Sequence, residues 1–462
     1  MKINKILLKG YNQFKDLEID LTYPAGHEKA GQPLDKVCFI GQSGTGKTSL
    51  LRLIKYFVTN DNAIGTGVKL SPLEEGMVKM NMSFNDFIFL KDKNPSAFYI
   101  YDTLNSISTD GWFEKWKNEK TIHYSTNKPI LINFPTERLV SKNEDTSNES
   151  VVSISDEKKN ERIEYLENLE PGESIDFAFE DSSKAWDFVL CDIKKHQATE
   201  LEWRNRISET VLKLNSKHKD IEKISEEYKD WINTNPNPLD ILANELNKIL
   251  IDLGVKIKTD IDRESILHIG SILLQTLDGK TLDRNFWSTG TKQIIDTAMP
   301  LFEIKPKNAI ILIDEPERSL YPNLQQKVVD FYTGLGDNCQ FFFATHSPII
   351  ASSFDPWEII ELKFDDSKTN VIQEPNYLNE RHVDNYTVYP KYLKWDDILM
   401  KLFDLTDEGN NDYRVAELMK VAALKNELNE LKNKGENSGE AFEKKLDEFI
   451  KLKAKVGWNE KA

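Results

Sequence analysis

The stretch Gly41-Gln42-Ser43-Gly44-Thr45-Gly46-Lys47-Thr48 fits the spacing G-x-x-x-x-G-K-[S/T] and decides the fold of the chain. Residues 36–40, directly before it, predict a short buried strand, and residues 49–57, directly after it, predict an amphipathic helix. Between a strand and a helix, the glycines allow a tight turn whose N–H groups point inward, and the helix dipole favours an anion. The sequence therefore predicts a phosphate-binding loop formed by Gly41, Gln42, Ser43, Gly44, Thr45, Gly46, Lys47, Thr48 and Ser49.

Two side chains of this loop carry the expected chemistry. Lys47 would reach the β- and γ-phosphates of a nucleotide, and the Thr48 hydroxyl would ligate a magnesium ion. The alternative is a glycine-rich turn before an ordinary helix. About 0.02 chance matches to the motif are expected in a chain of this length, so we favour the phosphate-binding interpretation.

A second motif lies at residues 309–316, Ala-Ile-Ile-Leu-Ile-Asp-Glu-Pro. Its apolar run predicts a fully buried parallel strand, and Asp314 and Glu315 follow at the carboxyl end of that strand. Asp314 is suited to the coordination shell of magnesium, and Glu315 to polarising a water in line with the γ-phosphate. A strand ending in an acidic turn is the alternative, but a phosphate-binding loop needs such a carboxylate pair.

Three weaker signals accompany these motifs. Ser288 and Gly290 precede a helical run, where hydroxyl and N–H groups could meet a phosphate, although an ordinary serine cap explains Ser288 about as well. His346 follows the apolar run 340–344, which predicts another buried strand, and could contact a γ-phosphate; a lone histidine is more often structural. Asn12 lies in the turn of a predicted N-terminal hairpin, either near a nucleotide base or simply on the surface.

Composition limits the remaining classes of protein. The chain has 462 residues, 39% of them hydrophobic, a net charge of −16 and three widely spaced cysteines. We expect a cytoplasmic protein without a membrane span, a signal peptide or a zinc site. An acidic chain does not indicate a general DNA-binding protein, so nucleic-acid binding stays possible without support from charge.

Periodicity predicts the remaining secondary structure. A hairpin is expected over 1–21, strands over 77–84, 87–90, 129–134 and 357–362 with a less certain continuation over 363–376, and a helix over 325–332. The strand 129–134 ends in Pro135-Thr136-Glu137-Arg138, whose charges either border a ligand or form a surface pair. The tail 393–462 predicts a helical hairpin with a turn at 435–439.

A helical segment is expected from about Ala185 to Leu253. Within it, one helix with an a/d stripe is predicted from a 4-3-4-3 spacing of Ile207, Val211, Leu214, His218, Ile221, Ser225, Tyr228 and Ile232. The stripe covers nearly four heptads. It therefore predicts a short coiled-coil insertion rather than a long arm.

Taken together, GQSGTGKT, WSTGTKQ, AIILIDEP, ERSLYP and FFFATHSP follow an N-terminal hairpin in this order. In this the chain resembles the ABC-type ATPase heads of the SMC, RecF and OLD class over residues 1–150 and 265–365. The resemblance implies an α/β P-loop head, with a mixed sheet, helices and an N-terminal antiparallel β layer. It also implies ATP and Mg2+ as cofactors, and a homodimer or higher homo-oligomer in which two heads enclose two ATP molecules.

The resemblance gives the motifs their roles. Lys47 and Thr48 would be the Walker A pair, and Asp314 would be the Walker B aspartate, followed by the catalytic base Glu315. His346 would be the switch histidine.

In the same way, Ser288 and Gly290 would be the signature residues that clasp the γ-phosphate bound by the opposite subunit, and residues 319–322 would form the D-loop region. The signature WSTGTKQ departs from the commoner LSGGQ, and no Q-loop glutamine can be assigned. Both departures affect the expected hydrolysis rate more than nucleotide binding.

The expected organisation has four parts. The head is divided between residues 1–150 and 265–388, the helical insertion occupies 160–260, and a helical region for partner or self association occupies 389–462. The short insertion argues against a true SMC protein, and the short tail lacks the acidic clusters of a nuclease. The chain therefore looks like the stand-alone ATPase subunits of bacterial antiphage systems such as Septu, PARIS and the retron-associated ATPases, which control a separately encoded nuclease or toxin.

Two alternatives stay open. One is a RecF-like DNA-repair ATPase that binds DNA as an ATP-dependent dimer. The other is a scaffold that binds ATP and barely hydrolyses it.

Overall fold

The computed structural model describes most of the predicted head and the C-terminal helices. The described residues are 2–11, 13–58, 77–82, 85–91, 98–102, 130–136, 160–161, 164–165, 174–177, 184–212, 218–260, 272–373, 389–403, 412–435 and 438–456. The chain divides into two compact units, Met1–Tyr392 and Leu393–Ala462. The finer division predicted from the sequence stays a prediction.

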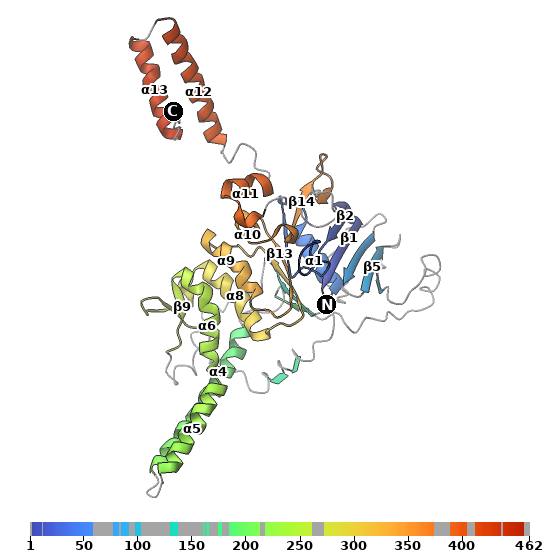
Figure 1. Ribbon diagram of the computed structural model, residues 1–462, viewed down its shortest axis with the longest axis vertical. Helices are drawn as coiled ribbons and strands as arrows, with labels where there is room; N and C mark the ends of the chain where they lie inside the picture. The colour runs from blue at the N-terminus through green and yellow to red at the C-terminus, as the bar shows by residue number, and fades with distance from the viewer. Residues whose placement is uncertain are drawn as a thin grey trace, which may run out of the picture. The chain divides into compact units, whose positions relative to one another are not determined.

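The first unit is built on a mixed sheet of twelve described strands (Figure 1), in the order β6-β5-β4-β1-β2-β15-β14-β3-β13-β12-β7-β8. Its parallel part contains β14 (Ile359–Phe364), β3 (Lys36–Gly41), β13 (Gln340–Ala344), β12 (Ile310–Asp314), β7 (Leu131–Phe134) and β8 (Ser174–Asp176). The strands β12 and β13 are buried along their whole length, as expected for a parallel sheet covered on both faces. The predicted strands 36–40, 309–313 and 340–344 are thereby confirmed.

An antiparallel layer extends the sheet beyond β14. It consists of β1 (Ile3–Tyr11), β2 (Phe14–Asp20), β4 (Met77–Met82), β5 (Asn85–Lys91) and β6 (Phe98–Asp102). The strand β15 (Val371–Gln373) joins the two parts, since it pairs antiparallel with β14 and parallel with β2. The predicted fold class is confirmed, whereas β14 ends at Phe364 instead of continuing.

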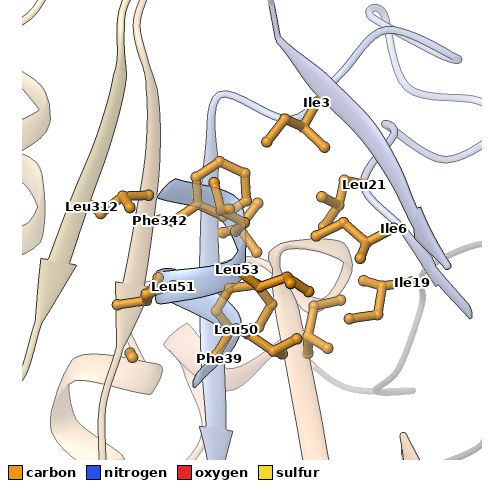
Figure 2. Packing of buried hydrophobic residues seen from close by; sticks show 14 of the residues in the cluster. Ile3, Ile6, Ile19, Leu21, Phe39, Leu50, Leu51, Leu53, Leu312 and Phe342 are labelled. Atoms are coloured by element: carbon orange, nitrogen blue, oxygen red, sulfur yellow. The ribbon is translucent and has the colours of Figure 1, made fainter. Parts of the chain in front are cut away.

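The helix α1 (Lys47–Val58) is enclosed between the antiparallel layer and the parallel strands. One apolar core joins these elements (Figure 2), and its labelled members are Ile3, Ile6, Ile19, Leu21, Phe39, Leu50, Leu51, Leu53, Leu312 and Phe342. The buried amide of Gln340 adds three hydrogen bonds across this junction: Oε1 accepts from Ile3 N at 2.7 Å, and Nε2 donates to Ile3 O and Leu34 O at 2.8 and 2.9 Å. The antiparallel layer is therefore tied to the sheet that carries the phosphate-binding loop.

The other helices of this unit form a second group. They are α4 (Lys184–Leu212), α5 (His218–Thr234), α6 (Pro238–Leu250), α8 (Thr289–Ile304), α9 (Pro322–Thr333) and α10 (Pro348–Ala351). Helix α6 packs against α4, α8 and α9. A small sheet follows α6 and contains β9 (Val255–Ile257), β10 (Leu274–Thr276) and β11 (Thr281–Leu282). Single 3-10 turns occupy Ile251–Leu253, Arg284–Phe286, Pro356–Glu358 and Pro390–Tyr392.

The helical insertion is present, but the prediction of one helix carrying the a/d stripe is wrong. Helix α4 ends at Leu212 and α5 begins at His218, and the two helices fold back on each other as a hairpin (Figure 1). His196 stacks on Trp231 at 5.0 Å and Trp203 lies 6.3 Å from Tyr228, so the earlier residue on α4 faces the later residue on α5, as in an antiparallel pair. The heptad spacing is the same before Leu212 and after His218, and periodicity alone cannot distinguish one helix from two in phase.

The second unit consists of α11 (Trp395–Leu402), α12 (Asp412–Asn433) and α13 (Glu440–Val456). Helices α12 and α13 pack together as the predicted helical hairpin, with ion pairs between Lys445 and Glu427 and between Lys455 and Glu417. Among the described helices of the whole chain, none has the length and apolar character that crossing a bilayer demands.

Candidate functional site

The loop between β3 and α1 has the backbone of an anion-binding turn. Gly41, Gly44 and Gly46 adopt φ values of +143°, +87° and +89°, which side chains other than hydrogen rarely allow. A Cβ at Gly41 would lie 2.2 Å from the carbonyl oxygen of Leu362, and one at Gly46 would lie 2.6 Å from the Phe14 ring. These glycines are therefore required by both conformation and space.

Lys47 lies across this loop. Its Nζ donates to the carbonyl oxygens of Gly41 and Gln42 at 2.8 and 3.0 Å. Burial lowers the pKa of Lys47 to about 8, although the nearby carboxylates of Asp314, Glu317 and Glu315 act in the opposite direction. The ammonium group is thus held at the loop, near the carboxylates at the end of β12.

Thr48 and Asp314 meet although they are 266 residues apart in the sequence. The Thr48 Oγ1 donates to Asp314 Oδ2 at 2.9 Å, and Asp314 is buried at the carboxyl end of β12. A hydroxyl and a carboxylate oxygen are hard ligands of the kind that Mg2+ takes, and Mg2+ in such sites completes its shell with water and substrate phosphates. The pair therefore fits the predicted magnesium ligands.

Glu315 occupies a conformation that is rare for a residue with a side chain. Its φ is +49°, and its backbone N–H donates to the carbonyl oxygen of Ala344 on β13 at 2.9 Å. The turn continues with Arg318 N donating to Glu315 O at 3.1 Å. Backbone strain of this kind is concentrated at functional sites. Glu315 directly follows Asp314, the last residue of β12, so both carboxylates lie at the same edge of the sheet.

His346 lies beside the loop as the sequence predicted. Its pKa is lowered by burial first and by the charge of Lys47 second, whereas Glu315, Asp314 and a hydrogen bond to the backbone of Gly41 raise it. The imidazole is therefore in the neighbourhood of these charges and is hydrogen-bonded to the Gly41 backbone. The structure therefore brings Lys47, Thr48, Asp314, Glu315 and His346 together from three neighbouring strand ends.

Ser288 and Gly290 lie at the start of α8. Ser288 caps this helix by accepting a hydrogen bond from Thr291 N at 3.0 Å. A Cβ at Gly290 would lie 2.7 Å from the carbonyl oxygen of Ser319, so the helix start packs closely on the turn after β12. Their contact with a nucleotide on another subunit stays a prediction.

Other residues modify this picture. Gln13 Nε2 donates to Gly44 O at 2.7 Å, so the N-terminal hairpin does reach the loop. Asn12, Glu137 and Arg138 lie outside the described residues. Arg318 Nη1 donates to Thr136 O at 2.5 Å, which joins the turn after β12 to the end of β7.

Glu317 and Gln325 also contact the site, through His346 and Ser347, and nothing in the sequence singles them out. An acidic residue in a turn and a glutamine on an amphipathic helix look the same as surface residues. Only the fold shows which strand ends they face.

A comparison with known protein families identifies the family of the chain. A family model described as an AAA ATPase domain matches residues 1–351. Among solved structures, the SMC head domain from Thermotoga maritima aligns with a TM-score of 0.39 and 11% identity, over 81% of this chain and 99% of that chain. An Smc head bound to the C-winged helix domain of ScpA gives 0.40 and 12%, over 81% and 97%, and one derived from Pyrococcus furiosus gives 0.37 and 14%, over 80% and 95%. At these TM-scores and identities the solved structures carry no argument about this chain, and no curated protein matched.

Proposed function

Because the chain belongs to the AAA ATPase domain family, we propose that it binds ATP with Mg2+ at the loop 41–48 and hydrolyses it. The observation that carries the proposal is the 2.9 Å hydrogen bond between Thr48 and Asp314, which joins the two motifs that such a reaction requires. Lys47, Glu315 and His346 surround this pair. Few other activities need an anion-binding loop and a carboxylate pair at the same strand ends.

Each residue then has a physical role. The loop N–H groups and Lys47 stabilise the negative charge of the β- and γ-phosphates, and Thr48 and Asp314 would hold the magnesium ion that supplies further neutralisation. Glu315 accepts a proton from the attacking water, and His346 contacts the γ-phosphate side of the site. Because burial holds the pKa of His346 low, the imidazole is neutral near pH 7 and can accept or donate a hydrogen bond there.

The second part of the proposal is an ATP-dependent homodimer. Ser288 is exposed at the start of α8, and Gly290 packs against the carbonyl oxygen of Ser319 in the turn after β12. Such a helix end on the surface is suited to a phosphate presented by a second copy of the chain. ATP would then join two heads, and hydrolysis would release them.

The third part is control of a separate protein effector, a nuclease or toxin, in an antiphage defence complex. Two helical hairpins, α4–α5 and α12–α13, extend the ATPase beyond what nucleotide binding needs, and the second belongs to a unit of its own. Paired helices with partly exposed apolar residues are common docking elements. The net charge of −16 gives the RecF-like alternative no support, and DNA binding is therefore an outcome of the test.

Turnover and assembly test the first two parts together. Wild-type protein should release phosphate from ATP, and Glu315→Gln should bind ATP but lose at least about a hundredfold in kcat, because the general base is gone. Light scattering should find this variant dimeric with ATP and monomeric without it. Glu226→Gln, an exposed change on α5, is the matched control and should behave as wild type. An unchanged rate in Glu315→Gln would contradict the assigned chemistry.

Copurification tests the third part. The protein should capture the product of a neighbouring gene, and Lys47→Ala should abolish protection against phage. Full protection by Lys47→Ala would refute the defence role. ATP-dependent and salt-sensitive DNA binding without any protein partner would favour the DNA-repair alternative.

A further inference from the structure

The loop that carries His346 makes side-chain bonds to the segment after β12. β13 ends at Ala344, and residues 345–347 lead into the short helix α10. The His346 backbone N–H donates to Glu317 Oε1 at 3.0 Å. One residue later, Ser347 Oγ donates to Gln325 Oε1 at 2.5 Å. The loop is therefore fixed at two successive residues by side chains from the acidic turn and from α9.

Both anchors are themselves held in place. Gln325 lies in the first turn of α9, and its Nε2 donates to the Leu320 carbonyl oxygen at 2.9 Å, so its amide is fixed at both ends. The Leu320 N–H donates to Glu317 O at 2.9 Å, and Ser319 between them has a φ of +62°. A turn with two non-glycine residues at positive φ, Glu315 and Ser319, has few alternative shapes. Both anchors are thus held by hydrogen bonds to the segment between β12 and α9.

The environment of Glu317 fits this use. Burial raises its pKa, while hydrogen bonds from the Thr345 side chain and from the His346 backbone lower it. A carboxyl group at this position, mostly removed from water, is costly unless it accepts such bonds. Two of its donors, the Thr345 side chain and the His346 backbone N–H, come from the histidine loop.

We propose that Glu317 and Gln325 are positioning residues for His346, which hold the histidine loop against the acidic turn in the geometry that ATP hydrolysis requires. The inference deepens the proposed function and rests on it. The same turn also touches the start of α8, because the carbonyl oxygen of Ser319 lies where a Cβ of Gly290 would be. Glu317 therefore connects His346 to the turn that also contacts the start of α8.

Kinetics of single variants give the first test. Glu317→Ala should lower kcat by about tenfold or more and leave the affinity for ATP within about threefold, because the loop 41–48 keeps its own contacts. Glu317→Gln keeps an oxygen that can accept the His346 N–H and should recover most of the rate. Gln325→Ala should lower kcat in the same sense. Gln326→Ala, the exposed neighbour on α9, is the matched control and should leave kcat unchanged.

A double-mutant cycle separates positioning from a general structural role. If Glu317 acts through His346, adding Glu317→Ala to His346→Ala should cause no further loss in kcat. Fully additive losses would overturn the proposal, and so would a Glu317→Ala variant with a wild-type rate.

Hydrogen exchange distinguishes a failure of the proposed anchoring from a failure of the proposed ATPase activity. In Glu317→Ala, amides of the peptide covering 344–351 should exchange at least about tenfold faster than in wild type, with the rest of the sheet unchanged. If the wild-type protein did not hydrolyse ATP, the proposed function would fail, and this measurement alone would decide the anchoring. Unchanged exchange at 344–351 would refute the anchoring whatever the kinetics.

Discussion

Replacing Gln340 by methionine should loosen the antiparallel layer from the sheet that carries the phosphate-binding loop. Gln340 is completely buried in β13, and its amide makes all three of its hydrogen bonds to backbone groups of Ile3 and Leu34. Methionine has a similar length and keeps the apolar contacts of the stem, so the loss of the amide is the main change.

The magnitude follows from the groups left behind. A buried backbone donor or acceptor that loses its partner costs about 1–3 kcal/mol. Ile3 N, Ile3 O and Leu34 O would all lose the Gln340 amide, so the free energy of unfolding should fall by about 3–9 kcal/mol. Such a loss is a large share of the about 5–15 kcal/mol that stabilises a typical domain.

Denaturant titration of the first unfolding transition measures this loss, with Gln326→Met on the exposed face of α9 as the matched control. Hydrogen exchange should show the increase in opening at 3–8 and 34–41 first, since these segments lose their partner. A decrease below about 1 kcal/mol, or equal decreases in Gln340→Met and Gln326→Met, would refute the argument that this amide joins the two parts of the sheet.

Three further predictions concern single residues. Gly41→Ala should abolish nucleotide binding and destabilise the fold by several kcal/mol, because its Cβ would lie 2.2 Å from Leu362 O. Gly26 has a φ of +92° but open space around it, so the control Gly26→Ala should cost only about 1–2 kcal/mol in denaturant titrations. Burial raises the pKa of Glu358 from 4.5 to about 7, so the folded state binds its proton more tightly and the free energy of unfolding falls as pH rises from about 4.5 to 7. Glu358→Gln should remove this dependence and be more stable than wild type by up to about 3 kcal/mol at pH 8. Parallel curves of stability against pH for the two proteins would contradict this. The affinity for ATP at constant free Mg2+ should weaken about tenfold between pH 7 and pH 9, as the Lys47 ammonium with a pKa of about 8 is lost, and a flat titration would contradict it.

The local parts of the site could be predicted from the sequence. The glycine spacing of residues 41–48 and the acidic pair after an apolar run are each short, and their chemistry depends on neighbours in the sequence. The strands at 36–41, 310–314 and 340–344 could be predicted for the same reason, because uninterrupted apolar runs are typical of buried parallel strands.

Features that depend on the order of the strands in the sheet could not be predicted from the sequence. Nothing in the sequence near Lys36 indicates that β3 would lie between β13 and β14, or that Gln340 would face Ile3. Gln340 stands at the start of its strand, and its partners Ile3 and Leu34 are 337 and 306 residues away in the sequence. Strand β8 and strands β9 to β11 have only two or three residues each, too few for a periodic signal.

The position of β3 has a consequence for synthesis on the ribosome. Both of its neighbours in the sheet, β13 and β14, come from the second half of the chain, about 300 residues after Gly41. At about 5–20 residues per second, the strand and its glycine loop would wait roughly 15 to 60 s without hydrogen-bonding neighbours. During that interval an apolar strand with two open edges is exposed, and the nascent chain should depend on chaperones until β13 emerges.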